Sequence, residues 1–335
     1  MMIKFITKNL AEIKEIIGYY INTGIPDYHK NIEEIKKSKN TVILGNFDGV
    51  HKGHQIILEK AVKQAKEKNL KTIVYTFSEY PKNKQTKITT CSEKAYLLSK
   101  SKIDYLYLEQ FEKVKNYSPK EFVEKVLIDT LNANEVYCGF NFTFGKDKSG
   151  NVDILKKLLK KKNIKLNVQD AVLDEDGEVI SSTRVRNLVK KGDFDKVREL
   201  LGHNFIILGE VVYGKQLGRV IGFPTANLKF ENKIYPEFGV YGVKIHIQDN
   251  DIAYNGVMNI GKNPTVDVGV LSVETNIFDF NENIYGKIIL IEVLENIRRE
   301  KKFGSVEELK EQIGKDVYYW KNKILDKGKC QKENR

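Results

Sequence analysis

The 335-residue sequence has few cysteines and no long apolar run. Its three cysteines (Cys91, Cys138 and Cys330) lie far apart and form no CxxC or Cys/His pattern, so neither a disulfide framework nor a zinc site is expected. No stretch approaches the roughly 18 apolar residues of a membrane-spanning helix, and charges interrupt the N-terminus where a signal peptide is apolar. The sequence therefore predicts a cytoplasmic protein without a membrane partner.

The net charge of +11 is unevenly distributed along the chain. Residues 1–200 carry most of the positive excess, whereas residues 201–300 are slightly acidic. The densest basic run, Lys156–Lys162, is typical of the solvated face of a helix. Nucleic-acid binding is thus an alternative that this distribution disfavours. Hydrophobic residues make up 41% of the chain, and at roughly 150 residues per domain its length predicts two globular domains.

Residues 41–77 have the pattern of a βαβ unit. A β-branched apolar run at 41–44 ends in a glycine-rich turn, helical spacing follows at 51–69, and another apolar strand is expected at 71–77. This order predicts a parallel α/β sheet, whose ligand crevice lies at the carboxyl ends of the strands. A later strand of the same sheet is expected at 135–142.

After about residue 204 the pattern changes from helical spacing to alternation. Apolar and polar residues alternate at 241–248, and further strands are expected at 253–261 and 284–297. Several short strands without helices between them predict a small, closed or nearly closed antiparallel β-barrel. A capping box at 305–308 marks the start of a terminal helix.

Two short helices are expected between these parts, because Gly192 and Gly202 are typical helix ends. The predicted organisation is an α/β domain, a helical linker, a barrel domain with its helix and a frayed tail, at residues 1–187, 188–204, 205–325 and 326–335.

The turn GNFDGVHKGH carries two histidines within a frame of glycines. Gly45, Gly49 and Gly53 allow the backbone to approach a ligand, and the helix that begins near His51 directs its N-terminal amides to the same place. The imidazoles of His51 and His54 can donate hydrogen bonds to phosphate oxygens as negative charge grows in a transition state. The turn therefore predicts a phosphate site, although a lone histidine here would more often be an ordinary helix-end residue.

The same turn resembles the nucleotide-binding signature of the adenylyltransferase module of bacterial bifunctional riboflavin kinase/FAD synthetases. HxGH also occurs in other nucleotidyltransferases, but three further segments in the family's order narrow the resemblance: YTFSEYP, GFNFTFG and SSTRVR. Together they span most of residues 40–187. The resemblance implies a Rossmann-like HxGH nucleotidyltransferase domain that joins FMN to the AMP part of ATP, giving FAD and pyrophosphate.

The resemblance also implies roles for single residues. His51 and His54 would act as catalytic groups on the ATP phosphates, and Phe77 and Asn141 would bind the flavin. Tyr80 departs from the family, which usually has histidine there. The residues expected to bind ATP are Gly45, Asn46, Phe47, Asp48, Gly49, His51, Gly53, His54, Ser182, Thr183 and Arg186, although a simple N-cap would also explain the SSTR segment.

The second part resembles riboflavin kinase over about residues 209–320. The segments that carry this resemblance are GEVVYGKQLGRVIGFPTANL, GVMNIGKNPTV, VETNIFDF and IYG. Prolines beside glycines and before threonines suggest rigid loops that present hydroxyl groups. The resemblance implies a compact barrel that phosphorylates riboflavin to FMN with ATP and Mg²⁺.

In this domain the resemblance assigns Glu274 as the general base for the riboflavin 5′-hydroxyl, a carboxylate that without the motif would be taken for a surface residue. Thr225 and Asn227 would bind Mg²⁺ and phosphate oxygens, and hard oxygen ligands suit that cation. Asn263 stands where the family often has arginine, so no role is predicted for it. The loop over the nucleotide would consist of Gly214, Lys215, Gly218 and Arg219.

One chain is thus predicted to convert riboflavin through FMN to FAD, with ATP, riboflavin and FMN as small-molecule substrates and Mg²⁺ as cofactor. Two alternatives stay open. The chain could be a monofunctional riboflavin kinase with a drifted first domain, for which Tyr80 is the main reason, or a flavin-sensing nucleic-acid binder. The sequence also leaves a homo-oligomer open.

Overall fold

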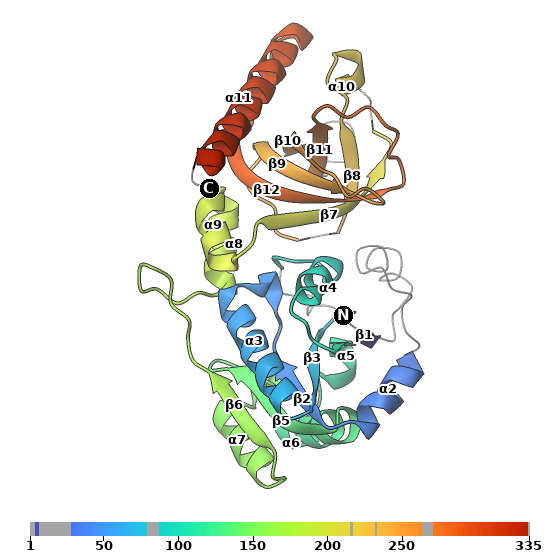
Figure 1. The fold of residues 1–335 in the computed structure, drawn as a ribbon, viewed down its shortest axis with the longest axis vertical. Helices are drawn as coiled ribbons and strands as arrows, with labels where there is room; N and C mark the ends of the chain where they lie inside the picture. The colour runs from blue at the N-terminus through green and yellow to red at the C-terminus, as the bar shows by residue number, and fades with distance from the viewer. Residues whose placement is uncertain are drawn as a thin grey trace. The chain divides into compact units, whose positions relative to one another are not determined.

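The computed structural model describes residues 4–6, 28–78, 87–214, 217–231, 233–262 and 271–333. The chain divides into two compact units, Met1–Val185 and Arg186–Arg335 (Figure 1). This division falls two residues before the predicted boundary at 187. Among the described residues, no helix combines the length and the apolar character needed to cross a membrane.

Unit 1 is built on a six-stranded sheet with the order β1-β4-β3-β2-β5-β6, and every pair is parallel. From β2 the chain adds β3 and β4 on one side and then returns to place β5 on the other. The switch point of this α/β sheet therefore lies between β2 and β5, where ligands bind at the carboxyl ends of the strands. The strands are Lys4–Ile6, Asn40–Leu44, Lys71–Phe77, Tyr105–Glu109, Ala133–Gly139 and Lys165–Gln169.

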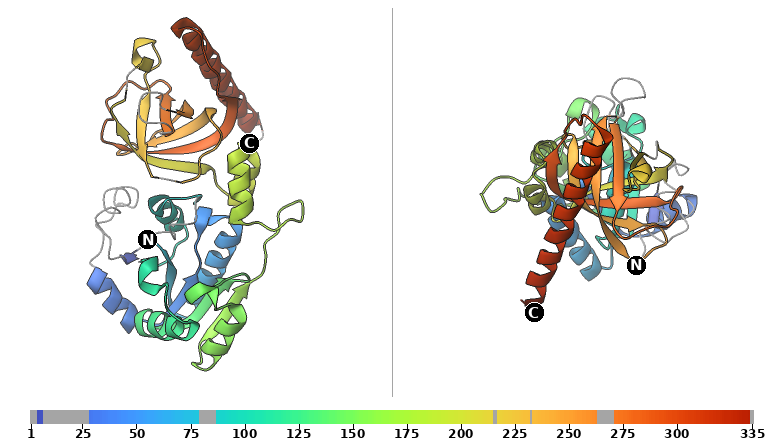
Figure 2. Two further views of the ribbon diagram at one scale, coloured as in Figure 1. Left: turned by 180° about the vertical axis from the view of Figure 1, so that it is seen from behind. Right: turned by 90° about the horizontal axis from the view of Figure 1, so that it is seen from above.

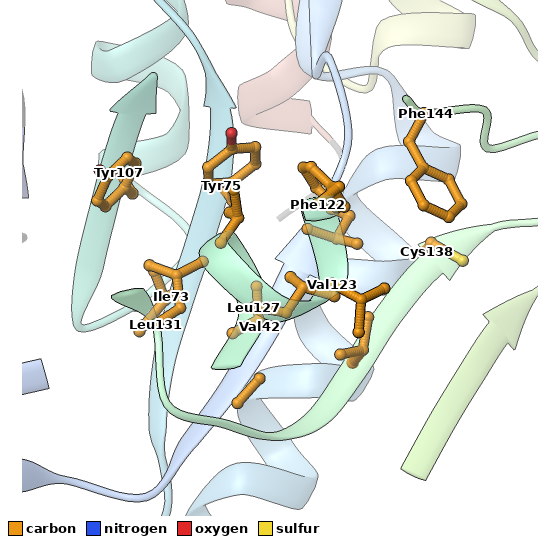
Figure 3. Packing of buried hydrophobic residues seen from close by; sticks show 14 of the residues in the cluster. Val42, Ile73, Tyr75, Tyr107, Phe122, Val123, Leu127, Leu131, Cys138 and Phe144 are labelled. Atoms are coloured by element: carbon orange, nitrogen blue, oxygen red, sulfur yellow. The ribbon is translucent and has the colours of Figure 1, made fainter. Parts of the chain in front are cut away.

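The helices of unit 1 pack on this sheet, and the π-helix η2 covers part of its apolar core. Val42 and Ile73 from the strands lie near Phe122 and Leu127 of η2 (Figure 3). The predicted strand at 135–142 ends earlier, because the amide of Phe142 turns back onto the Gly139 carbonyl at 3.1 Å. The helices are α2 Tyr28–Lys37, α3 Lys52–Glu67, α4 Cys91–Ser99, α5 Phe111–Val114, α6 Pro119–Glu121, η2 Phe122–Thr130 and α7 Val152–Lys160, with 3₁₀ turns η1 Asp48–Val50 and η3 Lys146–Lys148.

Unit 2 is the expected closed antiparallel barrel, with the strand order β10-β11-β8-β7-β12-β9. The last predicted strand starts later than 284, because the Lys287 amide donates to the Ile284 carbonyl and closes a turn. The strands are β7 Phe205–Val212, β8 Ala226–Phe230, β9 Gly239–Ile247, β10 Ala253–Lys262, β11 Leu271–Ile277 and β12 Ile288–Arg299, with the short helix α10 Leu217–Val220 between β7 and β8.

The terminal helix α11, Val306–Glu333, packs along one side of the barrel (Figure 2). Its Trp320 is buried against Gly242, where a Cβ would lie 2.4 Å from the indole, so glycine at this position makes room for the ring. Arg298 on β12 pairs with buried Asp316 of the helix. The helix continues to Glu333, into the residues predicted as a tail at 326–335.

The predicted linker at 188–204 contains parts of two helices, α8 Ser182–Lys191 and α9 Phe194–Leu201. Asp193 caps α9 by accepting from the Lys196 amide at 3.1 Å, and Gly202 ends the helix in the left-handed region, as predicted for this glycine. The Phe194 ring packs against Phe205 of the barrel. Helix α9 therefore packs on the barrel within unit 2.

Candidate active sites

The loop after β2 has an unusual backbone. Phe47 has φ 48° and Val50 has φ 43°, both in the left-handed region that aromatic and β-branched residues rarely adopt. Gly49 between them has φ 78°. Conformations of this kind cost free energy and concentrate at functional sites. Two such non-glycine residues within four positions favour the predicted phosphate role of this loop.

Two of its glycines make room for the protein's own rings. A Cβ on Gly53 would lie 3.2 Å from the His51 imidazole, and a Cβ on Gly45 would lie 3.0 Å from the Phe47 ring. The predicted reason for these glycines was close approach to a ligand. The contacts show that each also permits the packing that orients an aromatic side chain.

The two histidines stack on each other. Their ring centroids are 3.7 Å apart with 15° between the planes, and the Phe47 ring lies 5.1 Å from His54. Burial lowers the pKa of His51 to about 4, while Asp48 opposes the shift. The pKa of His54 is lowered well below 6.5, first by burial and then by the neighbouring charges of His51 and Lys94. Both imidazoles are therefore neutral at pH 7 in the free protein.

This burial predicts a pH-dependent stability. His51 has a lower pKa in the folded chain than in the unfolded chain, so the unfolded state takes up protons first as the pH falls below about 6.5. The His51 contribution should lower the free energy of unfolding by about 2 kcal/mol between pH 7.5 and pH 5. Urea unfolding of unit 1 at both pH values tests this, with His51→Gln as comparison. An equal pH dependence in that variant would contradict the assignment of a buried, neutral His51.

Asp48 shapes the loop through contacts with the protein. Its carboxylate accepts from the amides of Ile88 at 2.8 Å and Thr89 at 3.2 Å, and the Gly49 amide donates to the Thr89 hydroxyl at 3.1 Å. The Ser182 hydroxyl donates to the Asp48 carbonyl at 3.0 Å. The structure thus brings the start of the SSTRVR segment to the loop of residues 45–54, the histidine loop.

The other predicted residues of this site lie at its exposed or half-buried positions. Thr183 is exposed, and Arg186 follows one turn later in α8, beyond the division between the units. Phe77 ends β3 half-buried, with its ring edge-on to Phe111 at 5.3 Å, and Asn141 is exposed in the turn after β5. Because β3 and β5 flank β2, both lie at the same sheet edge as the histidine loop. Tyr80 lies outside the described residues.

A row of polar residues crosses three strands of the barrel. The strand register places Asn227 of β8 opposite Glu274 of β11, and Asn259 of β10 opposite the same glutamate. Directly paired residues on neighbouring strands share a face, with Cβ atoms about 5 Å apart. The Ser272 hydroxyl donates to the Glu274 carboxylate at 3.1 Å. The sequence motifs predict roles for Glu274 and Asn227 but none for Asn259.

Gly214 lies directly against this row, and Gly218 lies against Thr225, two residues before Asn227. A Cβ on Gly214 would lie 2.3 Å from the Asn227 amide group, and a Cβ on Gly218 would lie 3.2 Å from the Thr225 hydroxyl. The structure therefore brings Gly214, Gly218, Thr225, Asn227 and Glu274 together. Arg219 is exposed on α10, whereas Lys215 and Asn263 lie outside the described residues.

Comparisons with known proteins identify the family of this chain. Residues 33–184 match the family model of FAD synthetase, and residues 201–324 match that of riboflavin kinase. A bifunctional riboflavin kinase/FMN adenylyltransferase of Haemophilus influenzae is 36% identical over 281 residues, which cover 82% of this chain and 91% of that protein. This chain belongs to the family of bifunctional riboflavin kinase/FMN adenylyltransferases. The family predicted from the sequence is thereby confirmed.

Other members and a solved structure extend the match. The riboflavin kinase/FMN adenylyltransferase of Bacillus subtilis is 38% identical over 300 residues, covering 86% of this chain and 93% of its own length. A crystal structure described as a macrolide-efflux protein from Streptococcus pneumoniae is 35% identical, with a TM-score of 0.73 over 84% of this chain and 93% of that chain. Matches to both family models favour the bifunctional interpretation over a monofunctional riboflavin kinase.

The donor set on the barrel fits the Mg²⁺ that riboflavin kinase chemistry implies. Thr225 offers a hydroxyl oxygen and Asn227 an amide oxygen, beside the Glu274 carboxylate. No group of three His, Cys, Asp or Glu residues suited to a metal occurs in the part of the chain that the structure describes. Mg²⁺ commonly keeps several waters and shares substrate phosphates with few protein ligands, so these oxygens suit a cation that arrives with ATP.

Two further residues support these sites without having been predicted from the sequence. The Asn276 side chain is nearly buried and donates to the Pro224 carbonyl at 2.8 Å, which holds the GFPTAN segment beside Glu274. Lys94 on α4 is fully buried below the histidine loop. A capping box at Thr90 and Glu93 was visible in the sequence and locates the start of α4. No sequence signal indicated where the Lys94 side chain would lie.

Proposed function

We propose that this chain runs the two reactions of its family at two separate sites. The barrel of unit 2 phosphorylates riboflavin to FMN, and the histidine loop of unit 1 transfers AMP from a second ATP to FMN. The observation that carries the proposal is that each unit gathers its own set of polar groups, the stacked histidines after β2 in unit 1 and the Asn227–Glu274 pair in unit 2. Incubation with riboflavin, ATP and Mg²⁺ followed by chromatography tests it: FMN and FAD should both form, and folded protein that makes neither would contradict it.

In the kinase reaction, Glu274 accepts the proton of the riboflavin 5′-hydroxyl. The freed oxygen attacks the γ-phosphorus of ATP, the bond to the β-phosphate breaks, and ADP leaves. Thr225 and Asn227 hold the phosphates in line with the attacking oxygen, and Asn276 keeps their segment in place. Mg²⁺ bound with ATP would supply neutralisation of the phosphate charge. Positioning and electrostatics supply most of the acceleration in such transfers.

In the adenylyl transfer, a phosphate oxygen of FMN attacks the α-phosphorus of ATP. The bond between the α- and β-phosphates breaks and pyrophosphate leaves, so no protein nucleophile is required. His51 and His54 donate to the oxygens that gain charge, together with the first amides of α3. Neutral imidazoles suit this role because each retains one N–H donor. Phe77 and Asn141 would contact the flavin on the two sides of the loop.

Gly214→Ala should selectively damage the kinase reaction. Its new methyl group would overlap the Asn227 amide, which must then move away from Glu274. A displacement of about 1 Å can cost on the order of 10²-fold in rate, so a loss of that size is expected in riboflavin phosphorylation. Gly304→Ala is the control, because its Cβ would meet nothing closer than the Glu308 carboxylate at 3.5 Å. The rates of riboflavin phosphorylation are measured by steady-state kinetics. A wild-type rate for Gly214→Ala as well as for the control would contradict the close packing of Gly214 against Asn227.

Several sequence-based expectations stay predictions. These are the role of Arg186 on the triphosphate, the cytoplasmic location and a homo-oligomeric state. The nucleic-acid alternative predicts salt-dependent association with DNA or RNA.

A further inference from the structure

Lys94 is a buried lysine at the carboxyl edge of the sheet in unit 1. None of its surface is exposed, although lysine is among the residues that are least often fully buried. Its Nζ donates to the Phe77 carbonyl at 2.8 Å, to the Thr76 hydroxyl at 3.1 Å and to the Asn46 carbonyl at 3.3 Å. Three acceptors match the three N–H bonds of an ammonium group. The geometry therefore fits a protonated lysine.

These three oxygens come from the ends of two neighbouring strands. Strands β2 and β3 pair in parallel, and Asn46 lies in the histidine loop just after β2. Phe77 is the last residue of β3 and the predicted flavin contact. The Thr76 hydroxyl also donates to the Asn46 carbonyl at 3.1 Å. Lys94 thus links the histidine loop by hydrogen bonds to the end of β3, which is expected to contact the flavin.

Lys94 also places a charge beside the histidine pair. Burial lowers the pKa of Lys94, Cys91 and Asp48 oppose this shift, and Lys87 adds to it. The pKa of His54 is lowered by burial first, and then by the charges of its stacked partner histidine and of Lys94. Water screens charges poorly at buried positions, so a cation below a phosphate loop attracts a bound anion strongly.

We propose that Lys94 is a positioning residue for adenylyl transfer, whose ammonium sets the distance between the Asn46 and Phe77 carbonyls and adds positive potential below the triphosphate. The distance between these carbonyls governs how the attacking FMN phosphate meets the α-phosphorus. This inference rests on the activity proposed for unit 1. A buried charge is weak support for a fold, since apolar replacements of similar volume are often neutral or stabilising.

The test is Lys94→Met, which keeps an unbranched side chain only one atom shorter and removes the charge and all donors. With FMN and ATP supplied, kcat for FAD formation should fall on the order of 10²-fold, the loss typical of reacting groups displaced by about 1 Å. Riboflavin phosphorylation by the same chain should be unchanged. The His54 imidazole, followed by NMR, should titrate at higher pH than in the wild type, because a nearby positive charge is gone.

Lys71→Met is the matched control. Lys71 Nζ contacts Asp104 at 3.2 Å at the opposite end of β3, so this variant should form FAD at the wild-type rate. FAD formation by Lys94→Met at the wild-type rate would overturn the proposal. It would also be overturned if the His54 titration did not shift and the loss of FAD formation disappeared once the rates were divided by the folded fraction of the protein. If Lys94→Met does not fold, Lys94→Gln is judged by the same criteria. A wild-type chain that forms no FAD would instead contradict the activity itself.

Discussion

Glu274→Gln should lower the rate of riboflavin phosphorylation by about 10²–10⁴-fold, the usual contribution of a general base. Glutamine has nearly the same shape and retains an oxygen that can accept from the Ser272 hydroxyl. It cannot accept the 5′-hydroxyl proton as a carboxylate does. Because Glu274 lies in the row on the barrel, added FMN should still be converted to FAD at the wild-type rate. Both rates are measured by chromatography of the flavins.

Glu295→Gln is the matched control for this change. Glu295 also lies on a barrel strand, where it accepts from the Tyr319 hydroxyl and the Lys323 ammonium, away from the Asn227 row. Its variant should phosphorylate riboflavin normally. Folded Glu274→Gln protein that phosphorylates riboflavin at full rate would remove the general base from the mechanism. Loss of both activities would contradict the assignment of two sites.

The double change His51→Ala and His54→Ala should stop FAD formation and let FMN accumulate from riboflavin. Removing one donor to a developing charge commonly costs about 10²–10³-fold in kcat, and this variant removes two. The imidazoles are stacked in one buried arrangement at the start of α3, so their effects should not be additive. The measurement is a time course of flavin products from riboflavin and ATP.

His246→Ala controls for the loss of a histidine. His246 lies on the polar face of β9, where its Nε2 contacts the Glu292 carboxylate at 2.8 Å. Both activities should persist in that variant. FAD formation by the double histidine variant at a rate near the wild type would show that the HxGH turn does not act on ATP.

Much of the fold follows from hydrophobic periodicity. The hydrophobic pattern changes from helical spacing to alternation near residue 204, and this change separates the parallel sheet from the barrel. Both architectures are confirmed. The ends of elements depend on tertiary contacts that periodicity does not contain. Gly139 ends β5 through a local turn, and α11 continues to Glu333 although its polar end predicted a frayed tail. The sequence of helix α9 predicts a helical linker, because its apolar face gives no sign of what it packs on.

The candidate sites were predictable where their residues form short motifs. HxGH at 51–54 and the PTAN and VET segments each hold their polar groups within a few positions. Lys94 and Asn276 could not be found in this way, since their roles come from carbonyls that lie far away along the chain. The neutral state of His51 could not be predicted from the sequence either, because it results from burial in the assembled loop.

The central claim is that two independent sites share one chain, and mixing two inactive variants tests it most directly. Glu274→Gln and the double histidine variant are each supplied with riboflavin, ATP and Mg²⁺, alone and together. Alone, the first should make little FMN, and the second should stop at FMN. Together they should form FAD, because FMN released by one variant is adenylylated by the other. A mixture of folded variants that accumulates FMN without forming FAD would contradict the account.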